Sequence, residues 1–454
     1  MRSYDVIIIG AGVSGLAAAR NLILNGFDVL VLEARDYIGG RVVSEHFAGA
    51  TVDLGASWIH GVEENPITRL ATKHDIATQR SQMCGPSPDN ILHRTIFDEN
   101  FTRLTHEAKL EIASVMADFL DYLSSVQSED DLHLKSISDL KRCFMILYGD
   151  KAEKYQQHID YLVDTIFLYE FAVEADDLSA ESYHADHDFA GHDRLFPKGY
   201  GQIAYVLAQG VDILLNQVVQ QIEYSADMAK VITQDQQYSA SYVLVSVPLG
   251  VLKRGDIGFE PYLPRLKREA LHALQMGTLN KIYLAFDHVF WDKQAQSIAC
   301  LSDQHKIARE MINLYPMTER PILAAFTAGE FAESMERLSD QELVDLVIDA
   351  LRQMYGDNIP APVHHRITRW HQDPFSYGSY SYLPVDVKAS QRAHLAEAID
   401  SKVFFAGEAT SVYFPSTVHG AFLSGVRAAY EILQTDLLTE DIRRKTAKLE
   451  KVYL

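Results

Sequence analysis

Residues 5–15 read Asp5-Val-Ile-Ile-Ile-Gly10-Ala-Gly12-Val-Ser14-Gly15. The apolar run at 5–9 predicts a strand that is buried on both faces, and the Ala- and Leu-rich run at 16–24 predicts a helix. Between them the first glycine allows a tight turn, the second lets the backbone approach a pyrophosphate, and the third lets the helix pack closely on the strand. The stretch therefore predicts a dinucleotide site at the start of a helix.

A second predicted strand ends in an acidic residue. Residues 28–33 read Asp-Val-Leu-Val-Leu-Glu, and Glu33 follows Gly15 by 18 residues. An acid about 20 residues after the glycines accepts hydrogen bonds from a ribose hydroxyl. This spacing favours an unphosphorylated ribose and leaves both NAD and FAD open.

The next residues distinguish the two nucleotides by a family resemblance. Residues 34–41 read Ala-Arg-Asp-Tyr-Ile-Gly-Gly-Arg, and residues 53–61 read Asp-Leu-Gly-Ala-Ser-Trp-Ile-His-Gly. The two glycines bring backbone close to a nucleotide, and Arg41 offers a forked donor to its phosphates. These blocks resemble the flavin amine oxidase family, and most closely its polyamine oxidases. Further matching blocks are spread from residue 5 to residue 430.

The resemblance implies an α/β fold with a doubly wound, Rossmann-like FAD-binding domain and a second α+β substrate-binding domain. We expect the FAD-binding domain from residues 1–80, 195–255 and 385–435, and the substrate-binding domain from 81–194 and 256–384. Residues 436–454 are expected to form a polar helical tail. The implied cofactor-binding residues are Gly10, Gly12, Ser14, Gly15, Glu33, Ala34, Arg35, Gly40, Arg41, Leu54, Gly55, Ala56, Ser57, Val219, Trp370, Glu408, Thr417 and Val418.

Two later segments carry part of this cofactor assignment. Residues 213–223 resemble the strand whose backbone meets the adenine at Val219. Residues 403–421 read as a buried strand, then Glu408, then a turn into a helix that starts near Thr417 and Val418. The resemblance places that helix start at the flavin pyrimidine, where its positive end favours the charge gained on reduction. Ser379 stands where monoamine oxidases carry the cysteine that links to flavin, so we expect non-covalent FAD.

Lys281 is the implied catalytic residue. It lies at the start of a strongly apolar predicted strand. Burying a lysine there costs free energy, so we expect the side chain either to be exposed or to have a functional role. In the family the matching lysine holds a water against flavin N5. The alternative is a strand-end lysine that reaches solvent.

Four residues are implied in substrate binding. Tyr380 matches one wall of the family's aromatic cage, and Thr417 stands where monoamine oxidases carry the second tyrosine. His60 resembles the histidine that lies near the inner substrate nitrogen in polyamine oxidases. The alternative is a loop histidine that is hydrogen-bonded within the protein and does not bind substrate. Residues 81–190 show helical periodicity and are expected to form a lobe, in which Glu170 stands among the aromatic residues of Phe167-Leu-Tyr-Glu-Phe-Ala172. A carboxylate among aromatic residues either contacts a substrate ammonium, as the resemblance implies, or forms a structural ion pair.

The chemistry expected is oxidation of a polyamine. No second dinucleotide fingerprint is visible to hold NAD(P)H, so electrons from FAD are expected to leave to O2, giving H2O2. A polyamine such as spermine or spermidine loses hydride from an amine carbon to flavin N5, and the imine hydrolyses to an aldehyde and an amine. The amine must be neutral, so its pKa of ~10.4 must fall by desolvation.

Several other readings stay open. One is a flavin monoamine oxidase, and another is a lysine-demethylase-like oxidase, although demethylases carry a helical domain before the first flavin strand and a coiled-coil insertion. An amino-acid oxidase, a dehydrogenase that reduces a quinone, and a flavin-binding interaction protein without turnover also remain.

Composition excludes some partners. The chain has 454 residues, 47% hydrophobic and 23% charged, with a formal net charge of −21. That charge repels nucleic acid and anionic membranes, and no apolar run of ~18 residues exists to span a bilayer. Cys84, Cys143 and Cys300 are widely spaced and lack metal-ligand spacing, which predicts a cytoplasmic protein without a metal. The sequence leaves the oligomeric state open.

Overall fold

The computed structural model describes residues 3–81, 87–185, 189–225 and 227–453. The chain divides into two compact units. Unit 1 comprises residues 1–40, 203–272 and 390–454, and unit 2 comprises residues 41–202 and 273–389. Cys143 and Cys300 are free thiols, whereas Cys84 lies outside the described residues.

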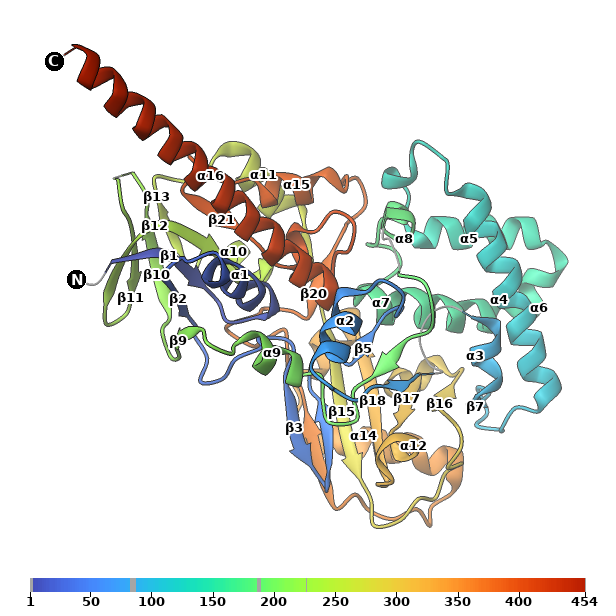
Figure 1. Ribbon diagram of the computed structural model, residues 1–454. Helices are drawn as coiled ribbons and strands as arrows, with labels where there is room; N and C mark the ends of the chain where they lie inside the picture. The colour runs from blue at the N-terminus through green and yellow to red at the C-terminus, as the bar shows by residue number, and fades with distance from the viewer. Residues whose placement is uncertain (1–2, 82–86, 186–188, 226, 454) are drawn as a thin grey trace. The chain divides into compact units, whose positions relative to one another are not determined.

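Unit 1 is built on an eight-stranded sheet (Figure 1). Its strand order is β13-β10-β11-β12-β1-β2-β9, and β21 also pairs with β12. The strands β21, β12, β1, β2 and β9 are parallel to one another, which is the doubly wound arrangement that the sequence predicts. The strands are β1 (Ser3–Ile9), β2 (Val29–Leu32), β9 (Asp212–Leu214), β10 (Val219–Glu223), β11 (Ala229–Thr233), β12 (Gln237–Val245), β13 (Gly258–Glu260) and β21 (Val403–Phe405). The helices are α1 (Val13–Leu24), α9 (Gln202–Leu207), α10 (Leu249–Arg254), α11 (Arg265–Ala273), α15 (Ser390–Ala396), the short η4 (Glu408–Thr410) and α16 (Val418–Tyr453).

Close packing around α1 depends on two glycines. A Cβ on Gly15 would lie 2.1 Å from the Gly10 carbonyl oxygen, so only glycine lets α1 begin against β1. A Cβ on Gly425 would lie 2.0 Å from the Ser14 carbonyl oxygen, where α16 packs on α1. The sequence patterns predicted β1 and α1, and the structure confirms both.

The strand predicted at residues 213–223 is wrong as a single element. The structure splits it into β9, beside β2, and β10, between β11 and β13. Asn216 takes a left-handed conformation at φ 56° and turns the chain between them. The amides of Asn216 and Gln217 donate to the carbonyls of Arg35 and Glu33, so this turn is fixed at the end of β2.

Unit 2 is built on a six-stranded sheet of order β19-β15-β18-β17-β16-β7. All of its pairs are antiparallel except β16 with β7. The strands are β7 (Arg94–Phe97), β15 (Leu279–Ala285), β16 (Ser297–Cys300), β17 (Glu310–Asn313), β18 (Ile322–Ala328) and β19 (His364–Ile367). Smaller sheets contain β3 (Ser44–Phe47), β4 (Ala50–Asp53), β5 (Trp58–Ile59), β6 (Gln79–Arg80), β8 (Arg194–Leu195), β14 (Gln275–Gly277) and β20 (Tyr380–Tyr382). The helices beside this sheet are α12 (Tyr315–Thr318), α13 (Gly329–Met335), α14 (Asp340–Tyr355) and the 3-10 turn η3 (Asp303–Ala308).

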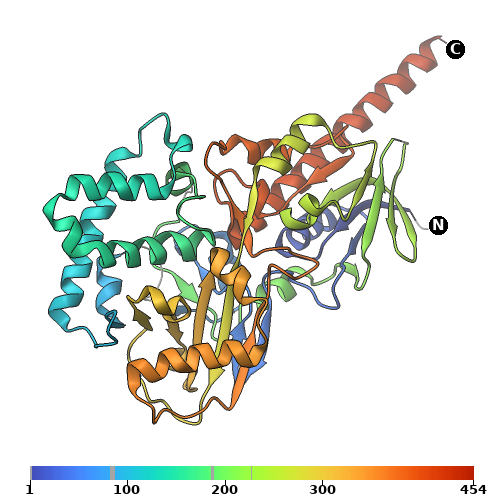
Figure 2. The ribbon, with the colours of Figure 1, turned by 180° about the vertical axis from the view of Figure 1, so that it is seen from behind.

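The two faces of this sheet are covered differently. Helix α14, orange in Figure 2, lies on the face that receives Ile282 and Leu284 of β15. The β3–β4 hairpin lies on the face that receives Tyr283. Because side chains alternate along a strand, Lys281 points to the hairpin side with Tyr283.

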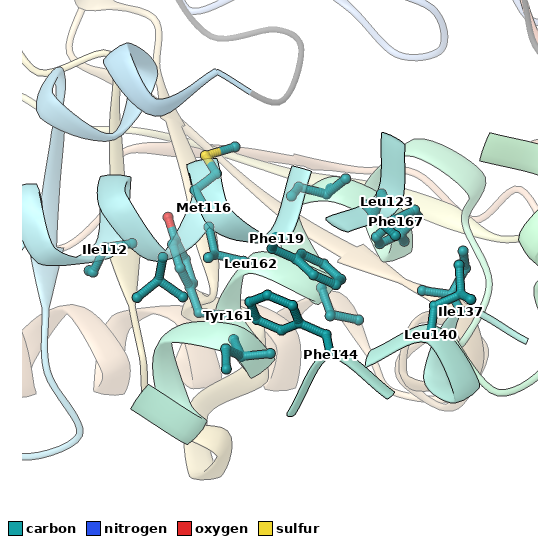
Figure 3. Packing of buried hydrophobic residues seen from close by; sticks show 14 of the residues in the cluster. Ile112, Met116, Phe119, Leu123, Ile137, Leu140, Phe144, Tyr161, Leu162 and Phe167 are labelled. Atoms are coloured by element: carbon teal, nitrogen blue, oxygen red, sulfur yellow. The ribbon is translucent and has the colours of Figure 1, made fainter. Parts of the chain in front are cut away.

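A helical lobe completes unit 2. It consists of α3 (Pro88–Leu92), α4 (His106–Val126), η1 (Leu132–Leu134), α5 (Ile137–Tyr148), α6 (Asp150–Val163), the π-helical turn η2 (Asp164–Leu168), α7 (Tyr169–Phe171) and α8 (Ala180–Ala185), whereas the short helix α2 (Pro66–Lys73) follows β5. Figure 3 shows its core, in which Phe119, Phe144 and Phe167 meet. The helical periodicity at 110–123 is confirmed as part of α4.

The unit boundaries differ from the expected domain boundaries. Residues 41–80, expected with the FAD-binding domain, belong to unit 2 because β3 and β4 pack on its large sheet. Residues 256–272, expected with the substrate-binding domain, belong to unit 1, where β13 pairs with β10, and residues 195–202, expected with the FAD-binding domain, belong to unit 2. The expected tail at 436–454 continues α16 as far as Tyr453. Among the described residues, no helix is both long and apolar enough to cross a bilayer.

The Gly425 contact generates a stability prediction. Gly425→Ala should lower the free energy of unfolding by about 1–3 kcal/mol, because the new methyl group overlaps the Ser14 carbonyl. Urea unfolding followed by circular dichroism measures this change. Gly258→Ala is the matched control, because its Cβ would meet nothing closer than 3.5 Å. Equal stability of the two variants would contradict the prediction.

Candidate functional site

The glycine turn of unit 1 has room at its centre. Gly10 has φ 103°, which permits the turn after β1, and Gly12 caps the start of α1. Within the described part of the chain, no atom lies within 4 Å of where a Cβ on Gly12 would stand. Gly39 donates to the Ala11 carbonyl at 2.8 Å, and a Cβ on Gly40 would lie 3.6 Å from the Cα of Gly12. Open space thus borders bare backbone at a helix start, which suits a pyrophosphate.

Glu33 lies beside this turn at the carboxyl end of β2. It is 6% exposed, and its Oε2 accepts a 2.6 Å hydrogen bond from the Ala11 amide. Its Oε1 accepts from the Arg35 amide at 2.9 Å. Burial raises the pKa of Glu33, and these amide donors act against that rise. A carboxylate has about four acceptor positions, so Glu33 retains capacity for a ribose hydroxyl.

Other candidate cofactor-binding residues lie at the same end of β2. Ala34 is half-buried, and the Arg35 guanidinium lies 5.4 Å from the centre of the Tyr37 ring. Val219 is 5% exposed and begins β10, just after the turn that is hydrogen-bonded to Glu33 and Arg35. Unit 1 therefore brings the glycine turn, Glu33 and Val219 together.

A second group in unit 1 surrounds the start of α16. Glu408 is 4% exposed, and its Oε2 accepts from the Ser416 amide at 2.9 Å. The Thr417 hydroxyl accepts from the Gly420 amide at 2.9 Å and donates to the Phe414 carbonyl at 3.0 Å. Thr417 is therefore the helix cap, and Val418 is the first residue of α16. This capping role did not emerge from the sequence.

Lys281 in unit 2 is buried, so the alternative of a solvent-reaching lysine is wrong. It is 3% exposed, and its Nζ donates to the Asp53 carbonyl at 2.9 Å, the Gly55 carbonyl at 2.6 Å and the Ser57 hydroxyl at 2.6 Å. Each of the three ammonium protons thus has an acceptor. Burial lowers the pKa of Lys281 to about 8, and the nearby Asp53 carboxylate opposes this shift.

Asp53 is a site residue that sequence reasoning missed. Its Oδ1 accepts from the Ser44 hydroxyl at 2.5 Å and from the Tyr200 amide at 2.8 Å. Burial raises its pKa to about 6, against the hydrogen bond from Ser44 and the charge of Lys281. Its position at the start of the 53–61 block was the available signal.

Residues 54–57 are held from three directions. Besides Lys281, the indole Nε1 of Trp370 donates to the Leu54 carbonyl at 3.2 Å, and the Ala56 amide donates to the Arg41 carbonyl at 3.1 Å. A Cβ on Gly55 would lie 1.9 Å from that Arg41 oxygen. Unit 2 therefore brings Arg41, residues 54–57, Lys281 and Trp370 together.

Two side chains expected near the flavin are engaged within unit 2. The Arg41 guanidinium donates to the Ser379 carbonyl at 2.9 Å. The Ser379 hydroxyl accepts from the Leu279 amide at 2.8 Å and donates to the Leu279 carbonyl at 2.9 Å. The two Ser379–Leu279 hydrogen bonds fix the start of β15, which carries Lys281, against the segment that leads to Tyr380.

Aromatic side chains continue from Lys281 towards Tyr380. The Lys281 Nζ lies 5.6 Å from the centre of the Phe326 ring, whose centroid is 6.3 Å from that of Tyr169. The Tyr380 hydroxyl donates to the Tyr169 carbonyl at 2.7 Å. Burial raises the pKa of Tyr380 well above its usual value, and the Glu170 carboxylate adds to this rise.

Glu170 itself is exposed, although its neighbours are aromatic. Phe167 and Phe171 point into the lobe core at 0% and 7% exposure, and the chain turns at Ala172 with φ 57°. The aromatic neighbours in the sequence therefore do not enclose this carboxylate. Its charge still acts on Tyr380.

His60 is oriented by an acid that the sequence did not indicate. Its Nδ1 lies 3.1 Å from Oδ2 of Asp193, whose Oδ1 accepts from the Gly61 amide at 2.7 Å. The Asn65 side chain donates to the His60 carbonyl at 3.0 Å. Asp193 lies 133 residues further along the chain, so spacing gives no signal for this pair.

Among the described residues, no group of three or more His, Cys, Asp or Glu side chains is placed to hold a metal ion. FAD, in contrast, fits unit 1, because open space adjoins the glycine turn and Glu33 has free acceptor capacity.

Comparisons with known proteins agree with this geometry. A family model described as flavin containing amine oxidoreductase matches residues 13–433. Polyamine oxidase 4 of Oryza sativa subsp. japonica is 35% identical over 451 residues, which cover 96% of this chain and 90% of that protein. Lysine-specific histone demethylase 1 homolog 2 of Arabidopsis thaliana is 34% identical, covering 94% of this chain and 58% of that protein.

The fold also resembles that of a solved enzyme. Putrescine oxidase bound to putrescine superposes with a TM-score of 0.76 at 22% identity, covering 95% of this chain and 99% of that chain. Together these matches confirm the predicted fold class and FAD as the cofactor. The chain belongs to the family of flavin-containing amine oxidoreductases, close to the polyamine oxidases.

Proposed function

We propose that the protein is a polyamine oxidase that acts on a spermine- or spermidine-like substrate. The observation that carries the proposal is the similarity to polyamine oxidases, one of which is 35% identical over 451 residues. A histone demethylase homolog is 34% identical over 450 residues. Because the demethylase is nearly as similar within the aligned region, a methylated lysine peptide is the competing substrate.

In this proposal unit 1 supplies most of the FAD-binding residues. The glycine turn and the start of α1 bind the pyrophosphate, Glu33 accepts from a ribose hydroxyl, and Val219 meets the adenine. Gly40, Glu408 and the start of α16 are the proposed contacts of unit 1 with the flavin half. In unit 2 the proposed FAD contacts are Arg41 and residues 54–57. When bound there, FAD would supply the acceptor for a hydride from the amine carbon and the electrons that reduce O2 to H2O2.

Lys281 is the proposed catalytic residue. Its lowered pKa of about 8 means that Nζ can release or regain a proton near neutral pH. The acceptors at Asp53, Gly55 and Ser57 fix the position of that proton. The family resemblance implies a water held by this lysine. Because all three Nζ protons have acceptors here, we propose that such a water takes the place of one of them and assists flavin reduction or reoxidation.

Tyr380 and its aromatic neighbours are the proposed walls for the reacting amine. An ammonium loses its hydration among such rings, which favours the neutral amine that oxidation requires. Because the pKa of Tyr380 is raised, its phenol stays neutral and continues to donate to the Tyr169 carbonyl. No negative charge then forms on this wall to favour the protonated amine.

Charge supports a polycationic substrate. The formal net charge of −21 raises the local concentration of a polyamine, and the exposed Glu170 carboxylate acts electrostatically on Tyr380. His60, held by Asp193, is proposed to face an inner substrate nitrogen. A cytoplasmic location is proposed from the two free thiols, Cys143 and Cys300.

Anaerobic mixing tests the substrate. The holoprotein is mixed with spermine, spermidine, N-acetylspermine, benzylamine or a methylated lysine peptide, and loss of oxidised-flavin absorbance is followed. We expect fast bleaching by one polyamine, with peroxide formed when air is admitted. Bleaching only by benzylamine or only by the peptide would assign a different amine, and no bleaching by any amine would refute the oxidase proposal.

Substitution of Lys281 tests its catalytic role. Lys281→Met should remain yellow at saturating FAD but slow flavin reduction or reoxidation on the order of 10²-fold, because the proton at Nζ is lost. Stopped-flow spectroscopy measures each half-reaction separately. Lys293→Met is a control at a lysine outside the candidate site. Unchanged rates of both half-reactions would remove Lys281 from the mechanism.

Two further substitutions test the FAD contacts. Glu33→Ala should weaken FAD binding roughly 10- to 100-fold, since hydrogen bonds to a charged group contribute about 1.5–3 kcal/mol. Gly12→Ala should fold normally, because its Cβ meets open space, yet also bind FAD more weakly. Equilibrium dialysis of the apoprotein with FAD measures both affinities, and Glu223→Ala in β10 is the control. Full FAD retention in both variants would refute these contacts.

A further inference from the structure

A second buried carboxylate, Glu336, lies behind Lys281. It caps the end of α13 and is 5% exposed. Its Oε1 accepts from the Asn280 side-chain amide at 2.7 Å and from the His371 amide at 2.9 Å. Its Oε2 accepts from the Gln372 amide at 2.8 Å. One carboxylate therefore joins α13 to the residue before Lys281 and to the residues after Trp370.

Asn280 extends these contacts to both Lys281 and Trp370. Its side chain is 3% exposed, and its Oδ1 accepts from the Trp370 amide at 3.0 Å and from the Thr368 hydroxyl at 3.2 Å. The same Thr368 oxygen accepts from the Lys281 amide at 2.8 Å. We call this set, Glu336, Asn280, Thr368, His371 and Gln372, the Glu336 clasp.

The two residues held by the clasp both hold residues 53–57. The Lys281 Nζ reaches Asp53, Gly55 and Ser57, and the Trp370 Nε1 donates to the Leu54 carbonyl. A continuous path of hydrogen bonds thus runs from Glu336 to the backbone of residues 53–57. All of these residues belong to unit 2.

We propose that Glu336 is a positioning residue, which fixes Lys281 and Trp370 against residues 53–57 and thereby sets FAD affinity and the rate of flavin reduction. This inference rests on the proposed function, in which residues 53–57 and Lys281 face the flavin. Glu336 does not itself touch the reacting groups, because its oxygens are taken up by Asn280, His371 and Gln372.

The chemistry of the clasp requires a carboxylate. A backbone amide donates to each of the two oxygens of Glu336. A glutamine would therefore present its NH2 group to one of these N–H donors in either orientation, leaving a buried donor unpaired. Glu336→Gln changes one atom and leaves the volume intact, so it tests the hydrogen bonds rather than the packing.

The test is a double-mutant cycle with Lys281→Met. The apoprotein's FAD dissociation constant is measured by flavin fluorescence quenching, and the anaerobic reduction rate is measured with the best amine. We expect Glu336→Gln to weaken FAD binding at least tenfold and to slow reduction at least tenfold. In the half-reaction that Lys281→Met slows, the double variant should match Lys281→Met within twofold, because Glu336 affects that rate through the lysine. Glu330→Gln, an exposed glutamate of the same helix, is the matched control.

Two results would overturn the inference. One is a lower melting temperature of Glu336→Gln while its FAD affinity and reduction rate are unchanged. That result would show that Glu336 has a purely structural role. The other is multiplication of the two rate losses in the double variant. If Glu336→Gln fails to fold, Trp370→Phe keeps an aromatic ring at this position but removes the indole N–H that donates to the Leu54 carbonyl. This variant should weaken FAD binding, and unchanged affinity refutes the path. The affinity measurement needs no substrate, so it separates this inference from the choice of amine.

Discussion

The buried ammonium of Lys281 is the constraint on which unit 2 depends. An unpaired charge in an apolar sheet is costly, and three oxygens of residues 53–57 supply the acceptors that it needs. To supply them, the segment after β4 must come close to β15, which requires Gly55 where it meets Arg41. The same burial lowers the pKa of Lys281, so the interaction that organises the segment also prepares a proton for exchange near neutral pH.

Unit 1 depends on close approaches of backbone rather than on a charge. Gly15 and Gly425 allow α1 to pack against β1 and α16, whereas Gly12 leaves space at the helix start. Glu33 then ties the end of β2 to the glycine turn through the Ala11 amide. A dinucleotide site results because packed backbone, a helix start and an acceptor meet at one edge of a parallel sheet.

The accuracy of the sequence predictions followed the range of the interactions. β1, α1 and the start of α16 were predicted well, because local periodicity and glycine spacing specify them. The segment at 213–223 was predicted wrongly, because the left-handed turn at Asn216 is stabilised by carbonyls at the end of β2. The sequence also failed to predict that Glu170 is exposed, because its aromatic neighbours in the sequence point into the core of the lobe and do not cover the carboxylate.

By itself, the sequence determined the dinucleotide fingerprint, the family resemblance and the candidate residues, because each depends on residue types at short, fixed spacings. Only the tertiary structure decided which distant groups meet. Lys281 contacts Asp53, which is 228 residues away in the sequence, and His60 contacts Asp193, which is 133 residues away. In the Glu336 clasp, Glu336 and Asn280 are 56 residues apart. Such pairs are set by strand order and loop packing, which no local pattern encodes.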